Sequence, residues 1–388
     1  MNIKPSNRLE GTEEYYFSQK LAEINQLRAS GSDIINLGIG NPDLPPPPEV
    51  IETLQRESAL LDCHGYQPYN GIPELRKAFS DWYNRFFHVS LNPDHEILPL
   101  IGSKEGITHI SLAFLNAGDK ALIPDPGYPA YESATRLTGA QPAKYLLTKE
   151  NDWLPDFDQI ENSGLDGIKI MWVNYPNMPT GAVANKDFFI KLLKFGRKHN
   201  ILICHDNPYS FILNEKPLSI LAVEESVGIA IELNSLSKSH NMAGWRVGMA
   251  AGSYALIREI LKVKSHVDSG IFRPLQLAAV QALKQPDEWY HDLNIVYKRR
   301  QVLALELVEC LNSTCDPTQK GMFVWAKIPD AYNHSADFSD DILYKARVFL
   351  TPGFIFGDQG KKHFRISLCS SEKKLQEAIS RIKNIVKN

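Results

Sequence analysis

The sequence predicts an α/β protein in which a large domain with a mostly parallel central sheet is joined to a smaller α+β domain. Two observations lead to this prediction. Between residues 95 and 255, short apolar runs alternate with segments of helical periodicity, a pattern typical of a parallel sheet covered by helices. After Pro274 the pattern changes to a long helical stretch followed by strand, helix, strand and helix.

The N-terminal arm is joined to the main body by four consecutive prolines, Pro45 to Pro48. Because proline fixes φ and lacks an N–H group, we expect this stretch to be extended and outside any sheet ladder. The runs that follow predict helices at 105–115 and 186–199, and strands at 97–101, 120–123, 168–173, 201–204, 228–233 and 248–251.

The C-terminal part begins with a helical stretch at 275–311, which we expect to be interrupted near Pro286. Strands are predicted within 321–329 and 362–371, each followed by a helix. These elements predict a large domain of residues 46–290 and a small domain of residues 1–45 and 291–388, to which the N-terminal arm returns.

Composition excludes several function classes. Lys and Arg number 42 against 45 Asp and Glu, so the formal charge is 42 − 45 = −3, which argues against a nucleic-acid or membrane partner. The five cysteines are odd in number and show no Cys-x-x-Cys spacing, which favours reduced thiols in a cytoplasmic protein. The first residues lack the apolar core of a signal peptide. No set of His, Cys or carboxylate residues has the spacing of metal ligands, so we expect no metal.

The segment SLSKSHNMAGWRVG carries the strongest chemical signal. Lys238 lies after an apolar strand between hydroxyl residues, eight positions before Arg246. A lysine amine can condense with an aldehyde, and an arginine fork matches phosphate oxygens. We therefore interpret Lys238 as a Schiff-base lysine, and Ser235, Ser237 and Arg246 as a phosphate site. Taken alone, a Ser-x-Ser-Lys is more often a solvated loop.

Three other strand ends support this interpretation. Asp206 follows a strand where open α/β sheets bind ligands, and could keep a pyridine nitrogen protonated; alone, it would more often form a turn or a helix cap. The turn at Gly102 and Ser103 leaves backbone N–H groups at a helix start, a weak anion-site signal. Tyr128 could stack on a planar cofactor, although a tyrosine packed at a turn is commoner.

Taken in order, these segments resemble the class I/II aminotransferases of the fold-type I pyridoxal 5′-phosphate enzymes. The resemblance covers nearly the whole chain, from IINLGIGNPDLPPPPEV through HGYQPYNGI, GSKEGI, PDPGYPAYES, NYPNMPTGAV and CHDNPYSFI to HFRISL. It implies that pyridoxal 5′-phosphate is the cofactor and that Lys238 forms its internal aldimine. Asp206 would pair with the pyridine nitrogen, and Tyr209 would donate to the 3′ oxygen.

The resemblance also implies the remaining site residues. Tyr128 would stack on the ring, and Arg365 with the backbone of Gly40 would bind the substrate α-carboxylate. Tyr66 would come from the neighbouring subunit of a homodimer with shared active sites. The phosphate would be held by Ser103, Lys104, Ser235, Ser237, Arg246 and Tyr66. The Lys104 side chain could instead face a distal substrate carboxylate, and the sequence leaves both interpretations open.

One position departs from the family pattern. The family normally carries Asn immediately before Pro-Thr-Gly, donating to the same 3′ oxygen as the tyrosine, and this chain has Met178 there. A thioether cannot donate a hydrogen bond. Asn177 lies one residue earlier, and its side chain would point the other way if the segment is extended.

The implied reaction is transfer of an amino group from an amino acid to a 2-oxo acid with ping-pong kinetics. The alternative is a pyridoxal-phosphate-dependent carbon–sulfur β-lyase, which would use the same Lys238, Asp206 and Arg246. A regulator with an aminotransferase-like domain is disfavoured, because no basic DNA-binding segment precedes the matching region.

Overall fold

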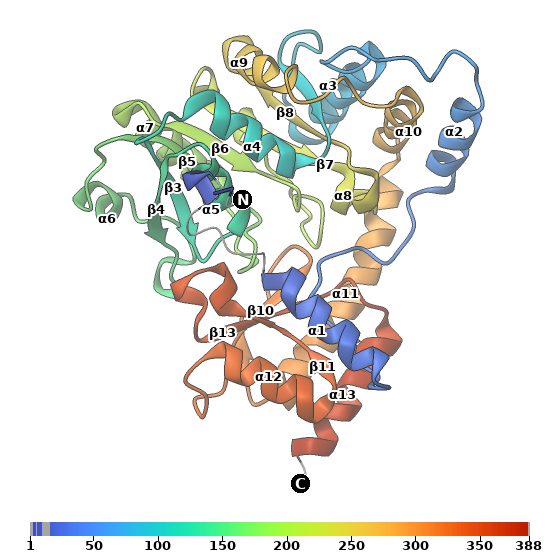
Figure 1. The fold of residues 1–388 in the computed structure, drawn as a ribbon, viewed down its shortest axis with the longest axis vertical. Helices are drawn as coiled ribbons and strands as arrows, with labels where there is room; N and C mark the ends of the chain where they lie inside the picture. The colour runs from blue at the N-terminus through green and yellow to red at the C-terminus, as the bar shows by residue number, and fades with distance from the viewer. Residues whose placement is uncertain (1–2, 5, 10–15, 387–388) are drawn as a thin grey trace.

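The large sheet is the central feature of the computed structural model, which describes residues 3–4, 6–9 and 16–386 (Figure 1). Its strand order is β2-β8-β7-β6-β5-β3-β4. Only β8 runs antiparallel to its neighbours, so the predicted mostly parallel sheet is confirmed. The strands are β2 (Ile97–Leu100), β3 (Lys120–Asp125), β4 (Gln141–Leu146), β5 (Ile168–Val173), β6 (Leu202–Asp206), β7 (Ala230–Ser235) and β8 (Gly248–Gly252).

Helices cover both faces of this sheet. In β5, Ile170 and Trp172 belong to one core cluster, whereas Met171 and Val173 belong to another, so alternate side chains are buried on opposite faces. This double burial explains the continuous apolar runs. One face carries α4 (Ser103–Phe114), α5 (Pro129–Leu137) and α9 (Tyr254–Lys264). The other carries α2 (Pro48–Ser58), α3 (Pro73–Phe87), α6 (Phe157–Asn162), α7 (Lys186–His199) and α10 (Arg273–Leu283).

A second body of structure is built from the C-terminal residues and the N-terminal arm. The arm packs on the C-terminal residues, because β1 pairs with β11 and Ile24 of α1 packs with Leu343 and Phe349. In Figure 1, α1 lies beside α12 and β11. The sheet of this second body has the strand order β12-β13-β10-β9. The elements are α1 (Tyr16–Ala29), β1 (Ile35–Asn36), α11 (Asp287–Cys310), β9 (Thr314–Cys315), β10 (Phe323–Lys327), α12 (Ser335–Ala346), β11 (Val348–Phe349), β12 (Thr351–Pro352), β13 (His363–Ser367) and α13 (Glu372–Val386).

Two predicted details change. Pro48 is not part of an extended run but the first residue of α2, a position where a missing N–H group costs no hydrogen bond. The edge strand β4 was not predicted, because its side chains are mostly exposed or half-buried and Pro142 interrupts the signal. The predicted interruption near Pro286 is confirmed, since α10 ends at Leu283 and α11 begins at Asp287.

Short helices complete the described part of the chain. The α-helical turn α8 spans Leu236–Ser239 and carries Lys238. The 3₁₀ turns are η1 (Asn7–Leu9), η2 (Lys149–Asn151), η3 (Ile220–Ala222), η4 (Glu224–Ser226), η5 (Ala243–Trp245), η6 (Gly353–Phe356) and η7 (Asp358–Gly360).

Candidate active site

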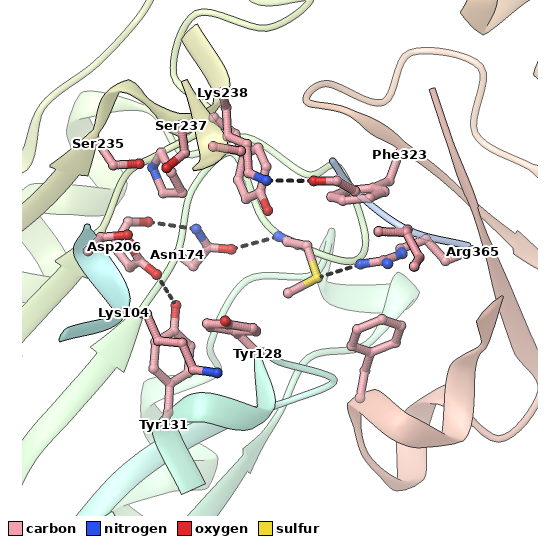
Figure 2. Close-up of a pocket in the computed structure, with 18 of the residues that line it drawn as sticks. Lys104, Tyr128, Tyr131, Asn174, Asp206, Ser235, Ser237, Lys238, Phe323 and Arg365 are labelled. Carbon is pink, nitrogen blue, oxygen red and sulfur yellow. Dashed lines mark hydrogen bonds between the residues drawn. The ribbon is translucent and has the colours of Figure 1, made fainter. Parts of the chain in front are cut away.

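A cavity of about 620 Å³ lies at the carboxyl edge of the parallel strands, where open α/β sheets bind ligands (Figure 2). Among the predicted site residues, Tyr66 alone does not line it. The predicted residues that do are Gly40, Ser103, Lys104, Tyr128, Asp206, Tyr209, Ser235, Ser237, Lys238, Arg246 and Arg365. Further lining residues that sequence reasoning missed include Ser18, Leu21, Ile39, Tyr131, Asn174, Phe323 and Phe356.

Lys238 is placed at the cavity by α8, directly after β7. Its Nζ donates to the backbone oxygen of Gly40 at 2.6 Å. Burial lowers the pKa of Lys238, and the nearby Arg365 and Arg246 lower it further. A lowered pKa favours the neutral amine, which is the nucleophilic form of lysine.

Asp206 ends β6 and points into the same cavity. Its Oδ2 accepts a hydrogen bond from the Tyr131 hydroxyl at 3.0 Å, whereas its buried Oδ1 has no hydrogen-bond partner among the described residues. The Tyr131 ring is itself held by stacking on Trp172, with centroids 5.1 Å apart. Burial raises the pKa of Asp206 to about 6, and the Tyr131 hydrogen bond counteracts this. A buried carboxylate oxygen without a partner is costly, so it invites a cationic or N–H ligand.

A candidate anion site lies at the start of α4. It is here called the cradle and consists of Ser103, Ser235, Ser237 and Arg246. Gly102 has φ +80°, and a Cβ atom there would lie 2.2 Å from Nη2 of Arg246. At Gly248 a Cβ atom would lie 2.8 Å from the backbone nitrogen of Ser103. Two glycines therefore let the guanidinium and the helix N-terminus come together. This arrangement, with Ser235 and Ser237 on the cavity wall, can bind a phosphate group.

Two tyrosines, Tyr128 and Tyr209, also line the cavity. The ring of Tyr128 lies edge-on to Tyr131, with centroids 5.7 Å apart. The ring of Tyr209 lies edge-on to Phe323 at 5.8 Å, and burial raises the pKa of its hydroxyl. The Tyr209 hydroxyl is therefore protonated at neutral pH and can donate a hydrogen bond.

Arg365 lies on β13, on the opposite side of the cavity. Its guanidinium carbon is 3.9 Å from the centroid of the Phe323 ring and 4.8 Å from that of Phe356. Its Nη2 donates to the backbone oxygen of Gly38 at 2.8 Å, and its Nη1 lies 3.2 Å from Sδ of Met178. The two rings hold the planar guanidinium in one orientation, as recognition of a carboxylate requires.

Met178 lines the cavity, and Asn177 does not replace the missing amide. The segment is a tight turn rather than extended: Asn177 Oδ1 accepts from the Thr180 hydroxyl at 2.8 Å, and its Nδ2 donates to the Asn174 oxygen at 3.2 Å. Asn174 is the amide on the cavity wall, but its Nδ2 donates to the backbone oxygen of Asp206 at 2.6 Å.

One group of metal-ligand type is formed by residues far apart in sequence. Glu105, His109 and Asp268 have ligand atoms within 4.8 Å of one another. The buried Nζ of Lys264 lies 2.7 Å from both carboxylate oxygens of Asp268, so a side-chain cation already pairs with this group. Sequence spacing could not show the group, because α4 and the end of α9 meet only in the fold.

Tyr66 lies on the surface, with 92% of its area exposed. It belongs to the loop between α2 and α3. No described helix is long and apolar enough to cross a membrane.

The cavity residues fit a phosphorylated pyridine aldehyde: no other residue in the described part of the chain pairs with Asp206 Oδ1, and the two glycines bring the Arg246 guanidinium and the N-terminus of α4 together as partners for an anion. An α/β sheet with a buried amine, a buried carboxylate and an anion cradle at one edge defines the fold-type I class of pyridoxal 5′-phosphate-dependent enzymes. The family model for aminotransferase class I and II matches residues 32–382, and the chain belongs to this family. It is an aminotransferase that uses pyridoxal 5′-phosphate.

Known relatives match over their full length. The chain is 41% identical to an LL-diaminopimelate aminotransferase of Dehalococcoides mccartyi, covering 98% of this chain and 99% of that one. It is 42% identical to an LL-diaminopimelate aminotransferase of Nitratidesulfovibrio vulgaris, covering 99% and 100%. Among solved structures, apo-BacF of Bacillus subtilis matches with TM-score 0.95 and 39% identity over 99% and 98% of the two chains. A mutant aspartate aminotransferase of Thermus thermophilus matches with TM-score 0.91 and 25% identity over 99% and 100%.

Proposed function

We propose that this aminotransferase moves the amino group of LL-diaminopimelate to a 2-oxo acid, with Lys238 as its catalytic amine. The observation that carries the choice of residues is the convergence of Lys238, Asp206 and Arg365 on one cavity. The substrate proposal is supported by the full-length relatives that bear this name.

The proposed roles follow from position and protonation. Bound pyridoxal 5′-phosphate supplies an aldehyde that condenses with amines and a ring that withdraws electrons from the substrate Cα. Asp206 holds a proton on the ring nitrogen, and Tyr209 donates to the ring oxygen. Arg365 binds the substrate α-carboxylate. The amine of Lys238 would take the proton from the substrate Cα and deliver it to the cofactor carbon that takes up the amino group.

The cradle residues Ser103, Ser235, Ser237 and Arg246 would hold the phosphate, with Tyr128 against the ring. Tyr131 supports Asp206 through its hydrogen bond. Lys104 lines the cavity, and we propose that it faces the distal carboxylate of a dicarboxylic substrate. Lys104→Ala should then raise the KM for LL-diaminopimelate but not for alanine. Equal changes for both would assign only the Lys104 backbone to the site.

We also propose a homodimer in which Tyr66 reaches the partner's site. Support comes from apolar side chains left exposed around Tyr66: Leu61 is 98% exposed and Val267 61%, and Phe272 stacks on His64. An exposed apolar surface of this kind favours association. The domain division at residues 45/46 and 290/291 and the cytoplasmic location stay predictions.

A panel of amino donors and 2-oxo acids tests the substrate proposal. LL-diaminopimelate with 2-oxoglutarate should give glutamate, and the meso isomer is a matched control for recognition of the distal centre. Aspartate, alanine and phenylalanine, with pyruvate and oxaloacetate as further acceptors, complete the panel. Turnover of another donor with none of LL-diaminopimelate would refute the substrate, and wild-type activity in Lys238→Ala would refute the catalytic amine.

A further inference from the structure

The segment 36–47, here called the strap, presents backbone oxygens to the side chains of both Lys238 and Arg365. Gly38 O accepts from Nη2 of Arg365 at 2.8 Å, and Gly40 O accepts from Nζ of Lys238 at 2.6 Å. The strap also packs closely on the Phe323 ring that supports Arg365, since a Cβ atom at Gly40 would lie 2.4 Å from this ring. Movement of the strap would therefore move the hydrogen-bond acceptors of both side chains.

The first half of the strap is held by the C-terminal strands. Leu37 N donates to Phe349 O at 2.9 Å, and Ser367 N donates to Leu37 O at 2.7 Å. The Ser367 hydroxyl donates to Ile39 O at 2.8 Å. Two more side chains of the C-terminal part add to this attachment, since Thr351 Oγ1 donates to Gly38 O at 2.9 Å and Ser370 Oγ donates to Asn36 O at 3.3 Å.

The second half of the strap is held by a bidentate ion pair. Asp43 Oδ1 lies 2.6 Å from Nη1 of Arg300, and Oδ2 lies 3.0 Å from Nη2. Arg300 is on α11 and only 3% exposed. The other described hydrogen bond in this half that reaches a distant element is from Asn241 Nδ2 to Pro45 O, at 3.2 Å.

Arg300 also holds the strand that carries Arg365. Its Nη1 donates to the backbone oxygen of Leu368 at 3.0 Å, directly beyond β13. One buried guanidinium thus joins α11, the strap and the end of β13. Lysine could not reproduce these contacts, because its single ammonium lacks the planar fork.

We propose that Arg300 and Asp43 are positioning residues, which set the second half of the strap against β13 and so fix Gly40 O relative to Lys238 and to the Phe323 ring that supports Arg365. This inference rests on the proposed roles of Lys238 and Arg365. Neither residue of the pair lines the cavity, so they act through the strap and not on the substrate. Loss of the pair should weaken binding of the substrate carboxylate and slow the reaction.

Cofactor retention should be unaffected. Among the described residues, no hydrogen bond joins the strap to Ser103, Ser235, Ser237 or Arg246. If the pair only stabilised the fold, its loss would weaken carboxylate binding and phosphate binding together. The experiment therefore measures probe binding and cofactor content side by side in each variant.

The test uses the holoenzyme of Arg300→Lys, Asp43→Asn and the double variant. The controls are Arg299→Lys, an exposed arginine one position away on α11, and Asp94→Asn, which removes a carboxylate paired with the buried Arg76. The probe is 2-methylalanine, which has an α-carboxylate but no Cα proton, titrated against the absorbance of the bound cofactor. KM and kcat for LL-diaminopimelate, cofactor content and thermal midpoints are measured alongside.

We expect both single variants to raise the Kd for 2-methylalanine by about 10- to 100-fold, the range expected when a binding group is misplaced by about 1 Å. Cofactor content should equal that of the wild type, and both controls should bind the probe normally. The double variant should bind it about as weakly as Arg300→Lys, because the two residues act as one unit.

Normal probe binding in Arg300→Lys and Asp43→Asn would overturn the inference, as would additive losses in the double variant. Loss of cofactor in parallel with probe binding would overturn it as well, since that indicates a general loss of structure. Failure of the proposed function would look different, because the wild-type protein itself would then bind no probe and turn over no amino donor.

Discussion

Replacing Asp206 by Asn should stabilise the cofactor-free protein at neutral pH, although it removes a proposed catalytic group. Burial raises the pKa of Asp206 from its usual 3.8 to about 6. Because a factor of ten in an ionisation constant corresponds to ~1.4 kcal/mol, this difference amounts to ~3 kcal/mol of unfavourable free energy in the folded state. An amide at this position carries no such penalty, and its oxygen can still accept the Tyr131 hydrogen bond.

The sign of the pH dependence follows from the raised pKa. Between pH 3.8 and 6 the unfolded chain loses the Asp206 proton while the folded chain keeps it, so stability falls as pH rises and the penalty is constant above about pH 6. The gain in unfolding free energy of Asp206→Asn over the wild type should therefore be small at pH 4.5 and reach up to ~3 kcal/mol at pH 8.

Urea unfolding of the cofactor-free proteins, followed by tryptophan fluorescence at both pH values, measures this difference. Asp125→Asn is the matched control, because the buried Asp125 carboxylate accepts backbone hydrogen bonds from Asp358 and Gln359, each at 3.0 Å, and its loss should destabilise the protein. Pyridoxal 5′-phosphate should reverse the order by stabilising the wild type more. Two results would refute the reasoning. One is a cofactor-free Asp206→Asn protein that is less stable than the wild type at pH 8. The other is a stability difference between variant and wild type that is as large at pH 4.5 as at pH 8.

Three further predictions concern the cofactor. Lys238→Ala should abolish amino transfer, measured by product formation, while some cofactor stays bound through its phosphate. Arg246→Gln should raise the Kd for pyridoxal 5′-phosphate by about 10- to 100-fold, from the loss of charge-assisted hydrogen bonds, and leave the binding of phosphate-free pyridoxal unchanged. Met178→Asn should lower the pKa of the lysine imine, since the added amide stabilises the ring phenolate; identical spectrophotometric titrations of this variant and the wild type would refute that role.

The sequence predicted best the elements whose local pattern agrees with their final environment. The strand Ile168–Val173 and the helix Lys186–His199 have the predicted bounds, because the strand is buried on both faces and the helix starts after a capping Asn185. The paired segments Ile35–Asn36 and Val348–Phe349 are too short to show any period, and more than 300 residues separate them.

The residues of the candidate site likewise fall into those that local motifs predicted and those that only the fold reveals. Lys238, Asp206 and Arg246 lie in local motifs at strand ends, where residue type and spacing indicate their chemistry. Phe323 and Phe356 were missed, because a phenylalanine acquires its role only by packing against Arg365 in the fold. The same holds for Arg300 and Asp43, whose contact spans 257 positions.

The central claim is amino transfer through a cofactor held at Lys238, and a single half-reaction tests it most directly. LL-diaminopimelate is added to the holoenzyme with no 2-oxo acid, and the cofactor spectrum, 2-oxo acid and ammonia are measured together. We predict one equivalent of 2-oxo acid per active site, stoichiometric conversion of the cofactor to its amino form, and no ammonia. Repeated release of ammonia and a 2-oxo acid without an acceptor, from an amino acid that carries a sulfur leaving group on its β carbon such as cystathionine, would contradict the account and indicate a lyase.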